Sequence, residues 1–309
     1  FMPFKRILFN KKGLIFDVKN VKWINSYAWV PTAYKIENTN KAIIFFAARN
    51  SSNESDIGYF IYDLDKMKIT KISNKPILKR GKLGNFDDSA AIPSHVIKIK
   101  RKFFLYYVGW TQGKKVPFFS SLGLAIANKI TGPYKKISNA PIIGRSKFNP
   151  LFVATCFVQK IKRGYDMYYT SNMSWKIKNN IPIPRYLIKK CHSKDGINWK
   201  INNDKIIKFE KNTEVAITRP WILKLSKNFV MFFSLKKINY KIETSVFKTG
   251  EIWKRKKVFD FKINKKINFD SKAQEYASLI KYKKKLFMFY NGNEYGKNGI
   301  GLAVANFND

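Results

Sequence analysis

The stretch Leu122-Gly-Leu-Ala-Ile-Ala-Asn128 recurs almost unchanged as Ile300-Gly-Leu-Ala-Val-Ala-Asn306, near the far end of the 309-residue chain. Each copy follows an apolar, aromatic run, which is Phe103–Tyr107 in the first case and Leu286–Tyr290 in the second. Two near-copies in the same context indicate a repeat architecture, in which further units are expected between and before them.

Five segments share one strand–turn–strand pattern and account for nearly the whole chain. Their first strands begin at residues 30, 92, 154, 219 and 277, which gives spacings of 62, 62, 65 and 58 residues. Short β-branched and aromatic runs separated by Lys, Asn and Gly turns predict hairpins whose strands are buried between layers. The strand pairs are Val30–Ile36 with Ala42–Phe46, Ile92–Ile99 with Phe103–Tyr107, Ala154–Ile161 with Tyr165–Tyr169, Arg219–Leu225 with Phe229–Phe233, and Ala277–Tyr282 with Leu286–Tyr290.

A third strand follows in every unit, and a more polar fourth strand ends most of them. The fifth unit stops after its third strand, whereas Lys5–Val18 contains strand-like stretches that precede the first unit. We therefore predict an all-β fold, a single five-bladed β-propeller spanning residues 1–309, with four-stranded blades. Residues 1–20 are expected to supply the outer strand of the last blade, because closure removes exposed strand edges. A β-sandwich would not require a period near 60 residues.

The charge is the most conspicuous feature of the composition. Sixty Lys and Arg face 20 Asp and Glu, for a net charge of +40. Only nine of the sixty are Arg, and Lys, Asn and Ile, all with A/T-rich codons, are abundant throughout. Readers of bases and phosphates depend on Arg forks, so we expect no nucleic-acid partner. A weak attraction to anionic membrane surfaces or charged glycans stays open on electrostatic grounds.

Several protein classes find no support in the sequence. No apolar run approaches the roughly 18 residues of a membrane-spanning helix, and no signal peptide is visible, so a cytoplasmic protein is expected. Cys156, Cys191, His95 and His192 are the only Cys and His residues, which scarcely permits a zinc site. There is no P-loop and no Gly-x-Gly-x-x-Gly after a strand, so we expect neither a metal nor a cofactor.

Acidic residues gather just ahead of the predicted first strands. In a propeller, those positions face a shared central funnel, and Asp87, Asp88, Glu214 and Glu275 occupy them in three of the five units. Acids crowded in a partly dry pocket acquire diverging pKa values, so one can donate a proton while another stays ionised. These four are the candidate catalytic residues. The alternative for Asp87 and Asp88 is that they cap a turn.

Candidate substrate-binding residues come from the same positions and from the ends of the second strands. Aromatic rings there could stack on sugars, Arg219 could hold a carboxylate or an anionic substrate group, and Asn291 could bind hydroxyls. The alternatives are core aromatics, a structural ion pair and turn formation by Asn-Gly. The candidates are Trp29, Trp110, Arg219, Tyr276, Asn291, Glu294 and Tyr295.

The sequence resembles the five-bladed propeller superfamily of arabinanase-, xylosidase-, invertase- and levansucrase-like carbohydrate enzymes. The resemblance rests on the repeated strand pairs, on Gly-Leu-Ala-Ile-Ala-Asn followed by Gly-Pro-Tyr, and on Ser193-Lys-Asp-Gly-Ile-Asn-Trp199. It looks closest to an uncharacterised glycosidase-like branch, through Phe86–Ser94, Arg219-Pro220 and Phe289–Gly296.

That resemblance implies an Asp in the first blade as base or nucleophile, a second Asp that positions and tunes, and a Glu as acid. Asp87 or Asp88 would take the second role, and Glu214 or Glu275 the third. The first-blade position reads Ser26-Tyr-Ala-Trp29 and carries no acid. The leading hypothesis is an enzyme acting at a glycosidic bond, by hydrolysis or sugar transfer. The alternative is a catalytically inactive glycan-binding propeller.

Overall fold

The computed structural model describes residues 6–225, 228–248, 252–262 and 268–307. These residues form an all-β fold, as the short apolar and aromatic runs predicted. The described ranges contain no α-helix, only two short 3₁₀ turns, η1 (Val18–Asn20) and η2 (Asn293–Gly296).

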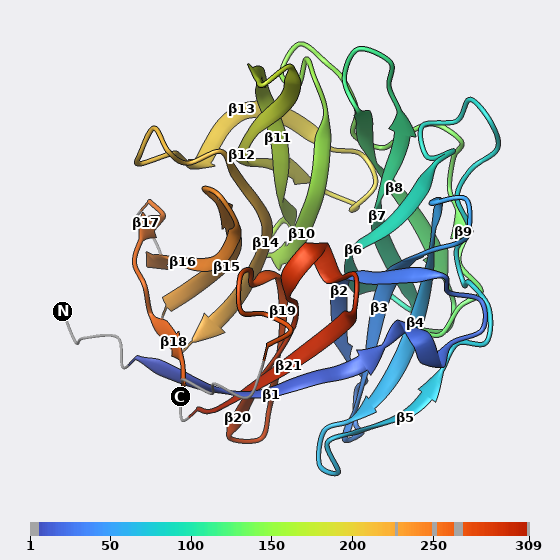
Figure 1. The fold of residues 1–309 in the computed structure, drawn as a ribbon, viewed down its shortest axis with the longest axis vertical. Coiled ribbons are helices and arrows are strands. Elements are labelled where there is room, and N and C mark those ends of the chain that lie inside the picture. Colours follow the sequence, from blue (N-terminus) through green and yellow to red (C-terminus); the bar gives the residue numbers. More distant parts are fainter. Residues whose placement is uncertain (1–5, 226–227, 249–251, 263–267, 308–309) are drawn as a thin grey trace.

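The strands pair as antiparallel meanders that follow the repeat. Consecutive strands hydrogen-bond within each meander, and the first strand of each is the one nearest the centre of Figure 1. The first meander contains β2 (Ser26–Lys35), β3 (Lys41–Arg49), β4 (Ser55–Asp63) and β5 (Lys68–Ile72). The second contains β6 (Ala90–Ile99), β7 (Lys102–Gln112), β8 (Phe118–Ala127) and β9 (Lys135–Lys136). The third contains β10 (Val153–Ile161), β11 (Gly164–Lys178), β12 (Ile181–Ser193) and β13 (Lys200–Ile207).

The remaining strands form two further meanders. The fourth contains β14 (Ala216–Leu225), β15 (Asn228–Lys236), β16 (Tyr240–Lys248) and β17 (Lys254–Arg255). The last contains β19 (Glu275–Tyr282), β20 (Lys285–Asn291) and β21 (Gly299–Asn306), with β1 (Ile7–Asp17) and β18 (Phe259–Phe261) on its outer edge. Hydrogen bonding joins these meanders into three sheets, since single parallel bridges, Ser55 to Ala90 and Tyr186 to Ala216, connect two pairs of neighbours.

The N-terminal strand pairs with the end of the chain. β1 runs antiparallel to β21, with Asn10 opposite Val304 and Asp17 opposite Gly299. Figure 1 shows this as the blue β1 lying beside the red β21. The expectation that the N-terminal segment adds the outer strand next to the last predicted strand is therefore confirmed for its described part. Residues 1–5 of that predicted segment lie outside the described residues.

The first strands contact one another in a closed ring. β2 contacts β6, β6 contacts β10, β10 contacts β14, β14 contacts β19, and β19 returns to β2. Every one of these strands has a bulge near its start, where the register to its neighbour shifts. Val30, Arg219 and Tyr276 adopt positive φ angles of 52°, 58° and 56° at three of these bulges. Bulges re-aim side chains, and here they turn side chains toward the axis.

The core lies between neighbouring meanders. The Phe60 ring stacks on Phe16 with centroids 5.0 Å apart, the Phe46 ring lies tilted at 4.8 Å from Phe16, and Tyr62 packs edge-on against Phe289 of the last meander. The second strands are continuous apolar runs, and because successive side chains point to opposite faces, both sides of each sheet are apolar there. Among the described residues, no helix has the length and apolarity required to cross a bilayer.

Candidate functional site

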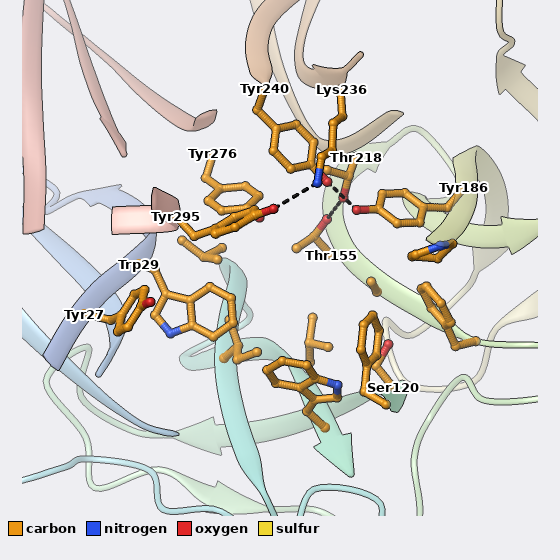
Figure 2. A pocket seen from close by; sticks show the side chains of 18 of the residues that line it. Tyr27, Trp29, Ser120, Thr155, Tyr186, Thr218, Lys236, Tyr240, Tyr276 and Tyr295 are labelled. Atoms are coloured by element: carbon orange, nitrogen blue, oxygen red, sulfur yellow. Dashed lines mark hydrogen bonds between the residues drawn. The ribbon is translucent and has the colours of Figure 1, made fainter. Parts of the chain in front are cut away.

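The bulges open into a cavity of about 340 Å³ that is lined by nine aromatic side chains (Figure 2). Every meander contributes to it, because each first strand points its opening residues toward the axis. Aromatic rings in a cavity can stack on the apolar faces of sugars and bury large areas at low entropic cost. The aromatic lining residues are Tyr27, Trp29, Trp110, Phe118, Phe152, Tyr186, Tyr240, Tyr276 and Tyr295.

Hydroxyl groups form the polar part of the wall. Thr155 and Thr218 lie 3.0 Å apart between their hydroxyl oxygens, and both contact the hydroxyl of Thr170, at 3.2 and 3.0 Å. The hydroxyls of Tyr186 and Tyr240 hydrogen-bond to each other beside them. Such groups both donate and accept, which suits recognition of sugar hydroxyls.

Two cations line the cavity. The Arg49 guanidinium lies over the rings of Tyr27 and Trp29, with its central carbon 4.2 and 5.5 Å from their centroids. Lys236 donates from Nζ to the hydroxyl of Tyr295 at 2.9 Å, as Figure 2 shows. Neither has an ion-pair partner among the described residues.

No carboxylate is among the described lining residues, but Glu275 lies directly behind them. Its neighbour Tyr276 lines the cavity, and the backbone N–H of Tyr295 donates to Glu275 Oε1 at 3.0 Å. Oε2 is buried and has no hydrogen-bond partner in the described part of the chain. Burial raises the pKa of Glu275 to about 8, although the Tyr295 N–H and the charge of Lys236 both act to lower it.

Asp87 occupies a different environment, inside the second meander. Its carboxylate accepts from the Tyr107 hydroxyl at 3.0 Å and pairs with Lys136 of the outer strand β9 at 2.5 Å. The same arrangement recurs in the last meander, where Asp270 accepts from the Tyr290 hydroxyl at 2.9 Å and pairs with Lys11 of β1 at 2.7 Å. In both cases the acid precedes the tyrosine by 20 residues. We call this repeated unit the acid–tyrosine brace.

The third meander contains a neutral version of the brace. Asn149 hydrogen-bonds to the hydroxyl of Tyr169, again 20 residues later, at 3.3 Å. Since an amide can replace the acid, the brace needs hydrogen bonding and not acid chemistry. Asp87 is therefore held by partners within its own meander, and it is absent from the cavity wall.

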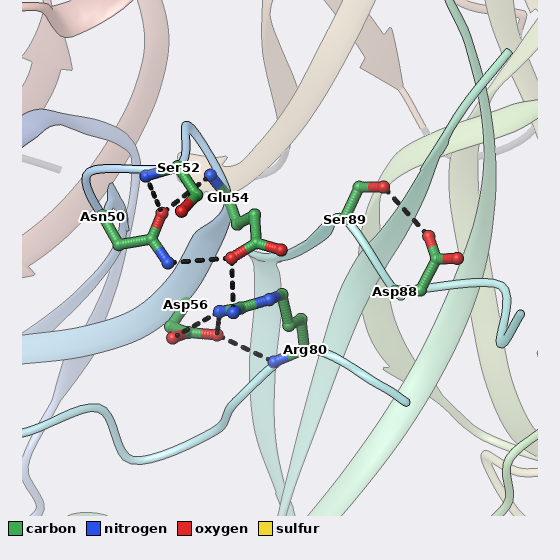
Figure 3. Close-up of polar contacts among 7 residues, drawn as sticks. All are labelled: Asn50, Ser52, Glu54, Asp56, Arg80, Asp88 and Ser89. Carbon is green, nitrogen blue, oxygen red and sulfur yellow. Dashed lines mark hydrogen bonds and ion pairs between the residues drawn. The ribbon is translucent and has the colours of Figure 1, made fainter. Parts of the chain in front are cut away.

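Asp88 caps a turn, which was the alternative considered for it. It accepts from the Ser89 hydroxyl at 2.9 Å, the Thr111 hydroxyl at 3.0 Å and the backbone N–H of Gly84 at 3.1 Å. Figure 3 shows Asp88 and Ser89 beside a second polar cluster, in which Arg80 contacts Glu54 and pairs with Asp56 at 3.1 Å. The acids of this surface are thus occupied by local partners.

Glu214 is buried but paired with a cation. Arg255 of β17 donates from Nη1 to both carboxylate oxygens, at 2.9 and 2.8 Å, and the backbone N–H of Glu210 donates at 2.9 Å. Burial alone would raise the pKa of Glu214, but these hydrogen bonds and the Arg255 charge hold it below the ordinary value. Glu214 is also absent from the cavity wall.

Three of the predicted substrate-binding residues do not line the cavity. Arg219 is fully buried and donates to the carbonyls of Ser94 and Pro31 and to the Thr32 hydroxyl, so it ties first strands together and holds no carboxylate. Asn291 accepts from the Val30 N–H at 2.8 Å and donates to Ala28 O at 2.8 Å and Gly299 O at 2.9 Å, which uses its amide for the bulge.

Glu294 is exposed and pairs with Lys297 at 3.0 Å. The other four predicted binding residues, Trp29, Trp110, Tyr276 and Tyr295, do line the cavity. Sequence reasoning missed Arg49 and Lys236, which end β3 and β15. Trp110 was predicted because it lies near the end of a second strand. The same criterion, applied to the second strand of every meander, would have identified Arg49 and Lys236. Sequence reasoning also missed Tyr186, which directly precedes the buried part of β12, because the long β11–β12 hairpin departs from the length of the other repeats.

Comparison with solved structures defines the fold class. A thermostable family-43 glycoside hydrolase superposes with a TM-score of 0.65, at 16% identity, over 94% of this chain and 91% of its own. A second structure, described as a glycoside hydrolase, superposes with a TM-score of 0.74 at 16% identity, over 95% and 90%. For an endo-arabinase from Bacteroides thetaiotaomicron the TM-score is 0.66 at 13% identity, over 96% and 98%. The chain therefore has the fold of the propeller glycoside hydrolases, as the repeat and the resemblance predicted.

In sequence, the chain is similar to the uncharacterised protein Rv1502 of Mycobacterium tuberculosis. The two are 28% identical over 296 residues, which is 95% of this chain and 98% of that protein. No family model matches the chain.

Proposed function

We propose that this protein is carbohydrate-active, binding a sugar in the aromatic cavity and acting there at a glycosidic bond, by hydrolysis or by transfer. The proposal is supported by nine aromatic side chains and a set of hydroxyls around one cavity of sugar size. The fold shared with glycoside hydrolases supports the same class of substrate by analogy.

The architecture we propose is a single five-bladed propeller. Its support is the closed ring of contacts among β2, β6, β10, β14 and β19, together with the pairing of β1 with β21. In that arrangement the axis carries the cavity, and every blade contributes a bulged first strand to its wall. Membership of a glycosidase-like branch of the superfamily is part of the same proposal.

Glu275 is the proton donor in this proposal, and its environment is the observation that carries it. A carboxyl group with a pKa of about 8 is mostly protonated at neutral pH, as a general acid must be. The Tyr295 N–H fixes one oxygen, and the other oxygen has no partner among the described residues.

A binding-only protein is the second candidate, because glycoside cleavage generally uses two carboxylates. Those groups flank the bond about 5–9.5 Å apart, one as acid and one as nucleophile or base. Asp87, Asp88 and Glu214 are proposed here as structural residues, so the described part of the wall offers no obvious second carboxylate. The absence of an acid in Ser26–Trp29 supports the same alternative.

The test is to incubate the wild-type protein and the E275Q variant with a broad panel of oligosaccharides and activated sugars. Product release or transfer is measured by chromatography, and binding by calorimetry. Turnover by the wild type and binding without turnover by E275Q would support the enzyme. Binding by both with turnover by neither would establish the binding-only function. If neither binds any sugar, the carbohydrate assignment fails.

A further inference from the structure

The cavity wall is positively charged as well as aromatic. In a chain with 60 basic and 20 acidic residues most cations lack an acidic partner, but surface cations are hydrated. Arg49 and Lys236 instead line a confined cavity that no acidic side chain of the described residues lines. A cation there is poorly neutralised, and its field acts on whatever the cavity holds.

The two cations belong to one arc of the wall. Lys236 donates to the hydroxyl of Tyr295 in η2, and η2 packs against β2. β2 supplies Tyr27 and Trp29, the rings that carry the Arg49 guanidinium. Figure 2 shows Tyr295, Trp29 and Tyr27 following one another along this side. A guanidinium can bind an oxyanion through two parallel hydrogen bonds.

The polar atoms of the wall that have no hydrogen-bond partner are also donors and not acceptors. Among the described lining residues, the buried side-chain atoms without a hydrogen-bond partner are Nε1 of Trp29, Nε1 of Trp110 and Nε of Arg49, all of them donors. Glu275, behind the wall, adds no negative charge while it is protonated. A cavity rich in donors and positive charge is complementary to a ligand with an excess of acceptors.

We propose that the cavity selects an acidic sugar, one whose own carboxylate binds on the side of the wall that carries Arg49 and Lys236 while its ring stacks on the aromatic residues. The inference rests on the proposed sugar-binding function and names its substrate class. An ionised carboxylate has only acceptors and carries a negative charge, so it matches the cationic donors of Arg49 and Lys236 in a way that the hydroxymethyl group of a neutral sugar does not.

The experiment compares acidic oligosaccharides with the same molecules after reduction of each carboxyl group to an alcohol. Fragments of polygalacturonate, glucuronoxylan and hyaluronan are titrated calorimetrically beside their carboxyl-reduced counterparts. At least one acidic member is expected to bind about tenfold tighter than its reduced form. R49Q and K236Q should abolish that preference, while the exposed-site controls R101Q and K75Q should keep it.

Four outcomes are informative. Equal or tighter binding of the reduced sugars would overturn the inference while leaving the proposed sugar-binding function intact. A preference unchanged in both R49Q and K236Q would overturn the assignment to these cations. Neutral sugars that bind only when inorganic phosphate is added would identify the anion as phosphate and also overturn it. If a thermal melting curve shows that R49Q is unfolded, loss of the preference in K236Q alone would still support the inference. Lys236 is partly exposed and its side chain supports no strand pairing, so K236Q is expected to fold.

Discussion

Glu214 and Glu275 precede or begin the first strands of neighbouring meanders and are almost equally buried, at 2% and 1% exposure, yet their environments are opposite. Arg255 on the outer strand neutralises Glu214 and lowers its pKa, whereas burial without a paired cation raises the pKa of Glu275 to about 8. The residue that gives Glu214 its low pKa therefore lies 41 positions away in the sequence, on another strand.

The largest effect is expected from E275Q, which keeps the shape of the side chain and its acceptor for the Tyr295 N–H but removes the titratable proton. Turnover of whichever glycan the wild type accepts should fall about 10²–10⁴-fold, with binding affinity within a few-fold. Steady-state kinetics and calorimetry on the same preparation check this. E214Q is a poor control because it breaks an ion pair, so D88N serves instead.

Removal of the cation partner of Glu214 should leave both glutamates buried without a paired cation and should lower the stability of the protein. R255Q leaves a buried carboxylate unpaired, so we expect the free energy of unfolding to drop by about 3–5 kcal/mol in urea denaturation. The double variant R255Q/E214Q should recover part of that loss because no charge then stays buried. If R255Q alone were as stable as wild type, the contrast between the two sites would not depend on Arg255.

The pH dependence of stability should differ between wild type and E275Q. Glu275 is protonated in the folded protein up to about pH 8 but ionises near 4.5, the ordinary glutamate value, in the unfolded chain. The folded state therefore binds more protons between these values, and this group's stabilisation declines as the pH rises from about 4.5 to 8. E275Q lacks the group, so its melting temperature relative to wild type should rise with pH across this window.

The acid–tyrosine brace offers a smaller effect on stability. Y107F removes the hydroxyl that donates to Asp87 and should cost about 1–3 kcal/mol in the free energy of unfolding. Turnover should stay unchanged, because the brace lies away from the cavity. A large loss of activity with intact stability would mean that Asp87 takes part in the reaction after all.

The smallest effect is expected for D88N. Asp88 accepts three hydrogen bonds in a surface turn, and an amide oxygen preserves part of that capping. We expect a change of about 1 kcal/mol or less in stability and no change in turnover. A drop in turnover comparable to that of E275Q would place Asp88 in the site.

The fold could be predicted from the sequence because its signal is repeated. The period near 60 residues and the copies at Leu122 and Ile300 specify equivalent strands, and the unpaired last unit pointed to β1 as the closing strand. Local sequence suffices for this inference, since a strand that is buried on both faces appears as a short continuous apolar run.

The site was harder to predict because position in a repeat does not determine the direction of a side chain. Asp87 and Glu214 occupy the expected positions, but Lys136 and Arg255 hold them inside their own meanders. Asn291 has hydroxyl-binding chemistry, yet the backbone of the Val30 bulge uses it. Pairings between residues so far apart, and bulges that turn a strand, leave no local sequence signal.

The most direct test of the account is the titration of the Glu275 carboxyl group itself. Carbon-13 NMR of protein labelled at the glutamate side-chain carboxyl, with signals assigned by comparison with E275Q and E214Q, reports both groups in one sample. We predict that the signal missing in E275Q titrates with a midpoint near pH 8 and that the signal missing in E214Q titrates below the ordinary glutamate value. A Glu275 midpoint near 4.5 would contradict the account, because the cavity would then hold no proton donor at neutral pH.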